Sequence, residues 1–291
     1  MVSTKSVLPR HKRVDDPPRM RLTERDTQVV LAVYEYRALR REQIEKLFFP
    51  SRNTANERLQ RLYQHGFLER RWSPVEFGQG TSQAIYLLAE KGADLVAQQL
   101  GIDRGTVAWQ ESHNEVGSPF LEHTLMVNDV RIAVTQAASQ AGYTIEKWVK
   151  EEALKATKDT VQVDTSGGAR RKIAVIADAY FVLNLGDKRA HFFLEVDRAT
   201  EANKRWALKV QAYRVYTESG KYSERYGTRS LRVLTVTIGP KRLVNLKHTT
   251  EKAGGRQMFW FTTLEQVRAG EGLLAEKIWE VAGQEGSSVL I

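Results

Sequence analysis

The sequence of 291 residues contains no cysteine. Disulfide bonds, zinc sites built on thiolates and cysteine nucleophiles are therefore excluded, and the composition suits a reducing compartment. No apolar run approaches the length of a bilayer span, and the N-terminal residues lack the apolar stretch of a signal peptide. We therefore expect a soluble, cytoplasmic protein that does not associate with membranes.

Two catalytic patterns are also missing. The six histidines include no pair separated by a single residue, which is the metal-binding pair that relaxase chemistry requires. The phosphate-cradling pattern G-x-x-x-x-G-K-[ST] does not occur either. Relaxase and ATPase activities are therefore not expected.

Positive charge is concentrated in the first quarter of the chain. Residues 1–72 hold 16 Lys and Arg against 9 Asp and Glu, a net charge of +7, whereas the other 219 residues hold 28 against 26. A basic domain attracts polyanions, usually nucleic acid, although a solvated basic surface is the simpler alternative. The length favours two domains, and the hydrophobic content of 42% is sufficient for two cores.

The basic quarter has the pattern of a winged helix-turn-helix. Prolines and charges indicate a flexible basic arm over residues 1–21. Helix caps, apolar spacing and turn residues then predict three short helices, a hairpin and a connecting helix. The expected elements are a helix capped by Thr23, helices at Arg41–Phe48 and Thr54–Gln64, strands at Phe67–Trp72 and Gln83–Leu88 around a turn-rich tip at Ser73–Ser82, and a helix at 89–100.

The helix Thr54–Gln64 is the candidate for reading DNA. Thr54 and Glu57 have the spacing of a capping box, and Ala55, Leu59 and Leu62 form an apolar back. The opposite face is rich in Asn, Gln and Arg, which bond base edges in the major groove, although a plain solvated face has the same composition. Arginines of the predicted hairpin would contact phosphates. The candidate DNA-binding residues are Arg52, Asn53, Asn56, Gln60, Arg61, Gln64, Arg70 and Arg71.

The rest of the chain predicts a three-layer α/β domain. A polar, glycine-bearing linker at 101–118 precedes a long helix at 120–141. Apolar runs and turn signals then define alternating strands and helices. We expect strands at Tyr143–Glu151, Lys172–Leu185, His191–Asp197, Ser230–Ile238 and Gln257–Phe261, a flexible loop at 155–171, a tight turn at Gly186-Asp187, helices at Glu201–Thr217 and Pro240–Lys252, and a closing helix through Leu274, Ile278 and Val281.

Three carboxylates lie on two of these strands. Asp178 stands alone in an apolar run, and Glu195 and Asp197 end the next strand on one face. The three could converge on a hard cation such as Mg²⁺ or Mn²⁺. Alternatively, Asp178 and Glu195 could pair with arginines such as Arg198 or Arg205.

The arrangement resembles the PD-(D/E)xK restriction-endonuclease-like fold, in which an acid on one strand precedes (D/E)-x-K on the next. The resemblance implies that Asp178, Glu195 and Asp197 bind metal. Asp197 occupies the place of the usual lysine, so Lys209 on the following helix is the candidate replacement. Lys204 is a weaker candidate because it points further away, and both are surface lysines in the simpler alternative.

The order of several motifs resembles the replication-relaxation family of plasmids and integrative elements. The motifs that carry the resemblance are LTERDTQVVLAVYEYRALRREQIEKLFF, RLQRLYQHGFLERR, YLLAEKGADLV, EHTLMVNDVRIAV, IADAYFVL and FFLEVDRATE. The family implies a winged-helix protein that binds double-stranded DNA in replication, mobilisation or their regulation. It also implies other replication or mobilisation proteins as partners, and a homodimer would suit two half-sites.

The expected fold is an α+β winged helix-turn-helix at 22–100 and, at 119–291, an α/β restriction-endonuclease-like domain with a mixed sheet. Two functions follow from this organisation. The first is sequence-specific binding of duplex DNA, with a nuclease-like domain that serves in contacts rather than cleavage. The second is a Mg²⁺- or Mn²⁺-dependent DNA endonuclease that the winged helix targets.

Overall fold

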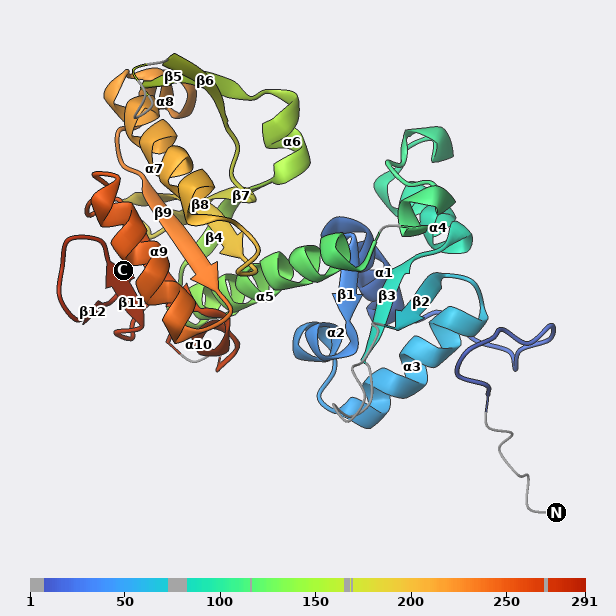
Figure 1. The fold of residues 1–291 in the computed structure, drawn as a ribbon. Coiled ribbons are helices and arrows are strands. Elements are labelled where there is room, and N and C mark those ends of the chain that lie inside the picture. Colours follow the sequence, from blue (N-terminus) through green and yellow to red (C-terminus); the bar gives the residue numbers. More distant parts are fainter. Residues whose placement is uncertain (1–7, 73–82, 116, 165–167, 169, 270–271) are drawn as a thin grey trace. The chain divides into compact units, whose positions relative to one another are not determined.

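The computed structural model describes residues 8–72, 83–115, 117–164, 168, 170–269 and 272–291. The chain divides into two compact units, Met1–Asn128 and Asp129–Ile291. The boundary falls inside helix α5 (Ser118–Gln140), ten residues after the predicted start of the second domain (Figure 1). Within the described part, no helix is long and apolar enough to cross a membrane.

The first unit combines helices with a small antiparallel sheet. Its strands lie in the order β1-β3-β2. The short strand β1, which the sequence analysis missed, pairs with β3 from Ala38 opposite Leu87 to Arg40 opposite Ile85. The predicted tip Ser73–Ser82 lies outside the described residues. The elements are α1 (Glu24–Tyr36), β1 (Ala38–Arg40), α2 (Arg41–Phe48), α3 (Arg52–Gln64), β2 (Leu68–Trp72), β3 (Ala84–Leu88), α4 (Glu90–Leu100) and two 3₁₀ turns at Arg104–Thr106 and Glu111–Glu115.

Side-chain caps define where the first helices begin. Thr23 and Asp26 form a reciprocal capping box on α1, as predicted. Helix α3 begins earlier than expected because the Ser51 hydroxyl, rather than Thr54, caps it and accepts a hydrogen bond from the Thr54 N–H at 3.4 Å. The predicted apolar back of α3 is confirmed, since its Ala and Leu residues are completely buried in the core.

Helix α4 crosses the start of β2 at very close range. The Ala89 N–H donates to the Phe67 carbonyl oxygen at 3.1 Å. A Cβ atom added to Gly92 would lie 2.1 Å from the same oxygen. Only glycine therefore allows the helix to lie against the strand at this distance.

The second unit is built on a mixed sheet of seven strands in the order β12-β11-β10-β9-β8-β7-β4. Strand β9 is parallel to both β8 and β10, and the other neighbours are antiparallel. Strands β5 and β6 form a separate hairpin. The elements after α5 are β4 (Thr144–Lys150), α6 (Glu151–Ala156), β5 (Asp159–Asp164), β6 (Arg170–Val175), β7 (Ala179–Asn184), β8 (Arg189–Asp197), α7 (Asn203–Glu218), α8 (Lys221–Tyr226), β9 (Arg232–Thr237), α9 (Pro240–Lys252), β10 (Phe259–Thr263), α10 (Leu264–Ala269), β11 (Trp279–Val281) and β12 (Ser287–Ser288).

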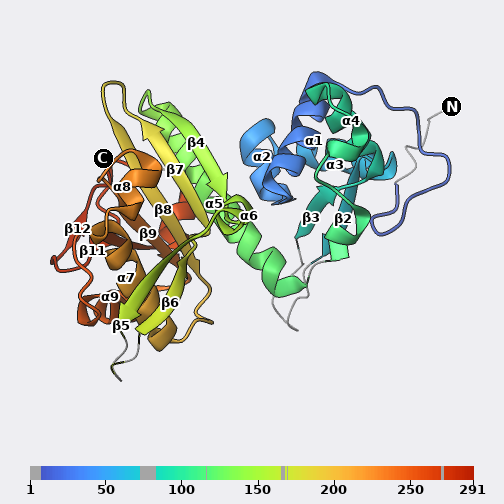
Figure 2. The same ribbon diagram turned by 90° about the horizontal axis from the view of Figure 1, so that it is seen from above.

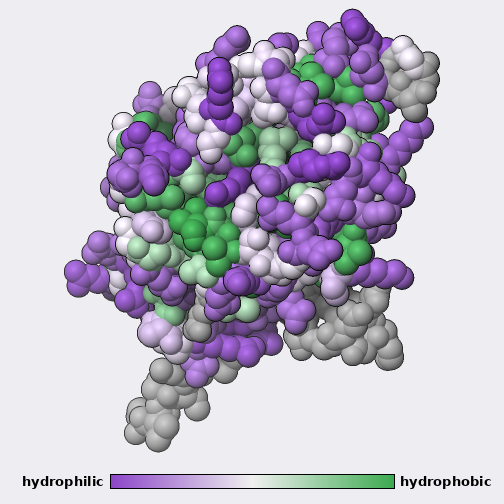
Figure 3. Space-filling model, turned by 90° about the vertical axis from the view of Figure 1, so that its left-hand side faces the viewer, coloured by the Kyte–Doolittle hydropathy of each residue, from purple (hydrophilic) through white to green (hydrophobic). Residues whose placement is uncertain are grey.

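Helices α7 and α9 cover one face of this sheet (Figure 2). Their buried residues include Trp206 and Tyr213 on α7 and Leu246 on α9, which share one core with Phe193 of β8. The hairpin β5–β6 packs on α7 through the same core. The face in Figure 3 is mostly hydrophilic around a smaller hydrophobic area.

Two predictions for this unit are wrong near β6 and β7. The segment 155–171, predicted as a loop, contributes to the hairpin β5–β6. The single strand predicted at Lys172–Leu185 is two strands in two sheets, separated at 176–178. Asp178 ends the ladder between β7 and β8, because its N–H donates to the Leu194 oxygen at 2.9 Å and its Oδ2 accepts from the Val196 N–H at 2.7 Å.

The predicted closing helix is also wrong. Its region contains strand β11, in which Trp279 and Val281 are buried and Glu280 between them is not. This alternation is the period of a strand, and Trp260 of β10 pairs opposite Val281. Helices α8 and α10, which are short, were not predicted.

Candidate functional site

Asp178 and Glu195 lie at the ends of two neighbouring strands, as the sequence predicted. Strands β7 and β8 pair in the register Ala179 opposite Leu194, so the next positions along the ladder are Asp178 and Glu195. Side chains of directly opposed residues in antiparallel strands lie close together. The topology therefore brings these two carboxylates together.

Glu195 is buried beneath helix α7 and is only 3% exposed. Its Oε2 accepts a hydrogen bond from Lys209 Nζ at 2.6 Å, and its Oε1 accepts one from the Tyr213 hydroxyl. Burial raises the pKa of Glu195 to about 7; the charge of Lys209 opposes the rise and the charge of Asp178 adds to it. A carboxyl group with this pKa changes protonation near neutral pH.

Lys209 takes the position that the sequence analysis proposed for a lysine supplied by the helix. It lies one helical turn before Tyr213 on α7, so both side chains reach the same carboxylate. Burial lowers the pKa of Lys209, but attraction to Glu195 and Asp178 outweighs it, and the pKa lies above its ordinary value. Lys209 therefore stays protonated beside the two acids. No sequence signal indicates the hydrogen bond from Tyr213 to Glu195, because a tyrosine on the apolar face of a helix has the pattern of any core residue.

Asp197 does not join this pair. Arg242 of α9 binds it in a bidentate ion pair, with Nε 2.8 Å from Oδ2 and Nη2 2.9 Å from Oδ1, and the Thr237 hydroxyl donates to Oδ2 at 3.0 Å. Burial works to raise the pKa of Asp197, but these bonds outweigh it and lower the pKa. The predicted ion-pair alternative named Asp178 and Glu195 with arginines. The structure instead pairs Asp197 with Arg242, and Glu195 with Lys209 rather than with an arginine.

The residues that the structure describes contain no group of three His, Asp or Glu side chains arranged to hold a metal ion. The predicted three-carboxylate cluster is thus reduced to Asp178 and Glu195. One further polar group lies beside it. Thr235 of β9 is in register with Glu195, and its buried hydroxyl has no hydrogen-bond partner among the described residues.

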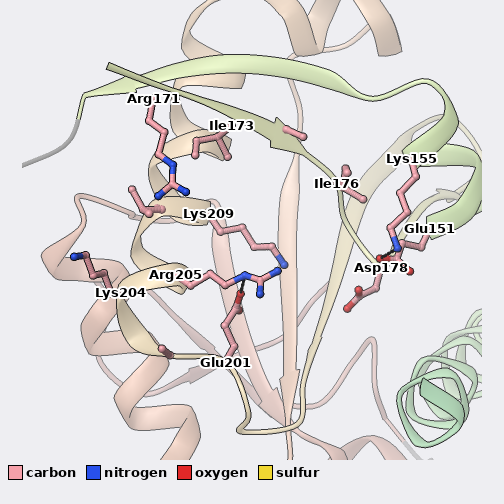
Figure 4. Close-up of a pocket in the computed structure, with 13 residues that line it drawn as sticks. Glu151, Lys155, Arg171, Ile173, Ile176, Asp178, Glu201, Lys204, Arg205 and Lys209 are labelled. Carbon is pink, nitrogen blue, oxygen red and sulfur yellow. Dashed lines mark ion pairs between the residues drawn. The ribbon is translucent and has the colours of Figure 1, made fainter. Parts of the chain in front are cut away.

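A cavity of about 830 Å³ opens beside Asp178 and Lys209. In Figure 4, Arg171 reaches from β6 towards the start of α7, while Asp178 lies near Glu151 on the other side. The lining residues are Glu151, Lys155, Arg171, Ile173, Ala174, Ile176, Asp178, Glu201, Ala202, Lys204, Arg205, Leu208 and Lys209. Cations thus outnumber carboxylates around an aliphatic interior.

In the first unit, the first two turns of α3 carry the exposed members of the predicted DNA-binding set. Arg52, Asn53 and Asn56 are exposed. Arg61 is partly exposed and its Nη2 lies 2.8 Å from Glu57 Oε1. A hydrogen-bonding surface therefore exists at the beginning of α3.

The second half of α3 is engaged by the N-terminal arm. Gln64 is 3% exposed; its Nε2 donates to the oxygens of Pro9 and Lys12 at 3.0 Å, and its Oε1 accepts from the Val14 N–H at 2.9 Å. Gln60 Nε2 donates to the Leu8 oxygen at 2.6 Å. The prediction that Gln64 reads bases is therefore wrong, because its amide forms hydrogen bonds with the backbone of the arm. Gln60 forms one such hydrogen bond and is only partly buried.

The arm also engages β2, so the described residues 8–21 differ from the flexible arm that was predicted. Arg13 Nη2 lies 2.7 Å from Glu69 Oε2, and Arg70 Nη2 donates to the Arg10 oxygen at 2.6 Å. The Arg70 guanidinium also lies 4.3 Å from the centroid of the Tyr63 ring. Arg70 and its neighbour Arg71 are both only partly exposed. Arg70 holds the arm in place instead of projecting into solvent.

Comparison with known proteins gives one family. Curated protein sequences contain no match to the chain. Among solved structures, the restriction endonuclease FokI aligns with a TM-score of 0.31 and 9% identity over 85% of this chain and 43% of that chain. The aligned part is thus less than half of FokI, and at this score the likeness assigns neither fold nor activity. A sequence model of the replication-relaxation family matches residues 31–231, which is more than two thirds of the 291 residues. The chain therefore belongs to the replication-relaxation family.

Proposed function

We propose that the chain is a double-stranded DNA-binding protein of a mobile element, with its first unit a winged helix-turn-helix. The observation that carries this proposal is the exposed beginning of α3, with Arg52, Asn53 and Asn56, on a helix whose apolar back is fully buried. Reading helices of this class present their N-terminal residues to base edges. Replication, mobilisation or their regulation is the process we infer from the family.

The chemistry of these side chains fits the edges of base pairs. An Asn amide can bond adenine through two positions in the major groove, and an Arg can bond guanine or a phosphate. The helix is also held firmly, because the Arg58 guanidinium binds the buried carboxylate of Asp26 in the α1 capping box. A fixed helix loses little conformational entropy when it enters a groove.

The docked arm adds positive charge next to α3. Its backbone oxygens at Leu8, Pro9 and Lys12 face the amides of α3, while the side chains of Arg10 and Lys12 are exposed. Exposed cations beside a reading helix bind phosphates and release counterions. We therefore expect the affinity for DNA to fall steeply with salt.

Selection from a random duplex library, followed by fluorescence anisotropy, tests this proposal. Asn56→Ala should weaken binding to the selected site by about tenfold or more, as expected for a bidentate base contact, and should leave random-sequence binding almost unchanged. Gln99→Ala, at an exposed position on α4, is the matched control. Equal losses on selected and random duplexes, or no selected site at all, would refute base reading by α3.

A metal-dependent endonuclease is the second candidate. The observation in its favour is that Asp178, Glu195 and Lys209 come together at the strand ends beside a cavity. Two acids on adjacent strands and a lysine from the next helix form the arrangement that resembles the PD-(D/E)xK fold. Asp197 has no part in this candidate, because Arg242 occupies its carboxylate.

The residues present fit a divalent cation. Mg²⁺ is usually held by one or two carboxylates together with water and substrate phosphates, so Asp178 and Glu195 would be sufficient protein ligands. Burial is the main cause of the raised pKa of Glu195, and the charge of Asp178 adds to it while Lys209 opposes it. When bound, the metal would polarise a phosphodiester and activate water. Lys209 would hold its proton beside Glu195 and donate a hydrogen bond to a phosphate oxygen.

Incubation with supercoiled plasmid and Mn²⁺ tests the second candidate. The wild-type chain should nick the plasmid, and Glu195→Gln should abolish nicking while duplex binding by the first unit persists. Lys188→Gln, in the exposed turn between β7 and β8, is the control. Absence of nicking with Mg²⁺ and Mn²⁺, or nicking by Glu195→Gln, would refute the endonuclease candidate. Neither result would affect the DNA-binding proposal.

A further inference from the structure

We infer that the cavity of the second unit binds an unpaired strand of DNA, with Arg171 and Lys204 as its phosphate contacts. This goes beyond the proposed duplex binding, since it involves none of the residues of α3. The cations around the cavity differ in whether they form ion pairs.

Three of the five cations that line the cavity already have a carboxylate partner. Lys155 pairs with Glu151 at 2.6 Å, and Arg205 pairs with Glu201 at 3.2 Å. Lys209 pairs with Glu195 at 2.6 Å, as described above. Each of these three charges therefore has a neighbouring carboxylate, although the pairs of Lys155 and Arg205 lie at the surface.

Arg171 and Lys204 differ from these three. Neither forms an ion pair with any residue that the structure describes, and both are exposed at the cavity. Arg171 belongs to β6 of the hairpin, and Lys204 belongs to the first turn of α7, so the two cations come from different walls. Two uncompensated cations on two elements that border the cavity suit an anion at its edge.

The interior between these walls is aliphatic. Ile173, Ile176 and Leu208 line it, together with two alanines. A ligand for such a site needs negative charges at its edge and flat apolar groups that are stabilised when they are buried away from water. Phosphodiesters and unstacked bases have this combination, and their contacts are tolerant of sequence.

The size and charge of the cavity restrict which nucleotides and nucleic acids can bind in it. A volume of about 830 Å³ lies within the range of small-ligand sites, about 300–1,000 Å³, and is far too small for a duplex. The acids Asp178 and Glu151 on the other side disfavour a multiply charged nucleoside triphosphate but tolerate phosphodiesters with one charge per nucleotide. The choice of DNA over RNA rests on the proposed DNA binding by the first unit. If the second unit cleaves DNA, this strand is its substrate, but binding does not require cleavage.

Fluorescence anisotropy of the full chain with a labelled dT15 oligonucleotide tests the inference. The chain used in this experiment carries the substitutions Arg52→Ala and Asn56→Ala, so that α3 contributes little to the binding of dT15. Adding Arg171→Ala and Lys204→Ala should weaken dT15 binding by about tenfold and reduce the salt slope by about 1.4, since each phosphate contact on a single strand contributes about 0.7. The control pair Lys188→Ala and Lys241→Ala removes two exposed cations outside the cavity.

Each other outcome overturns the inference. The inference is overturned if dT15 does not bind before the cavity change, if the control pair loses as much binding, or if the RNA oligonucleotide rU15 binds as tightly as dT15. Duplex binding is measured separately in a chain with intact α3 and the cavity substitutions. Retained duplex binding separates failure of the cavity inference from failure of the proposed duplex binding. An unchanged urea unfolding transition of the second unit shows that the unit with the cavity substitutions is folded.

Discussion

Replacement of Arg58 by alanine should destabilise the first unit much more than its partly exposed position suggests. The side chain of Asp26 is 1% exposed, and that of Arg58 is 20% exposed. Arg58 Nε lies 2.9 Å from Asp26 Oδ1, and its Nη2 contacts Oδ2 and donates to the Arg21 oxygen at 3.2 Å. Without the guanidinium, only the Thr23 contacts would remain for a buried carboxylate.

The size of the effect follows from this geometry. Removing one partner of a fully buried ion pair costs about 3–5 kcal/mol. Water can enter where Arg58 was, because that side is partly open, so we expect a loss of about 2–3 kcal/mol in the free energy of unfolding. Arg61→Ala is the matched control one turn later, where an exposed pair with Glu57 is worth about 0.5 kcal/mol or less.

Urea unfolding measures the free energy of unfolding of both variants. Hydrogen exchange of the α1 and α3 amides assigns the transition to the first unit. Burial works to raise the pKa of Asp26, but the hydrogen bonds from Arg58 and Thr23 outweigh it and lower the pKa. A lowered carboxyl pKa stabilises the fold above the unfolded value of about 3.9, and this contribution is lost as the pH falls through the folded pKa. The difference between wild type and Arg58→Ala should therefore shrink below about pH 4. Equal losses in the two variants, or a difference that does not change with pH, would refute the reasoning.

Three other results are expected. Burial raises the pKa of Glu195 to about 7, so its contribution to stability is present below about pH 4 and is lost as the pH rises through 7; Glu195→Gln should abolish this slope in unfolding measurements. Arg242→Ala should cost about 3 kcal/mol in urea unfolding, because it leaves buried Asp197 without its guanidinium partner, and a loss no greater than that of exposed Arg205→Ala would contradict this. Gln64→Leu should release the arm and speed tryptic cleavage within residues 10–13, whereas unchanged cleavage would show that the amide does not hold the arm.

Local signals were sufficient to predict most helices. The capping box at Thr23 defines the start of α1, and Pro240 at the first turn of α9 defines another helix within the predicted bounds. The apolar spacing of α3 is likewise local. These features depend on residues within a few positions of one another, so the sequence contains them directly.

Contacts between distant segments could not be predicted in the same way. Arg242 lies 45 positions after Asp197, and no local pattern indicates that they pair. The amide of Gln64 has the same sequence signature whether it faces a groove or the backbone of the arm 50 residues earlier. The closing helix failed because Trp279 and Val281 fit a strand as well as a helix, and pairing with β10 decides between them.

The crossing at Gly92 limits how this molecule can change through evolution. The space there accommodates a hydrogen atom, whereas even the methyl group of alanine would meet the Phe67 carbonyl. Substitutions elsewhere on α4 can alter its surface, but any replacement at this position must move the whole helix. Engineered variants and natural relatives that keep the crossing should therefore share a glycine here.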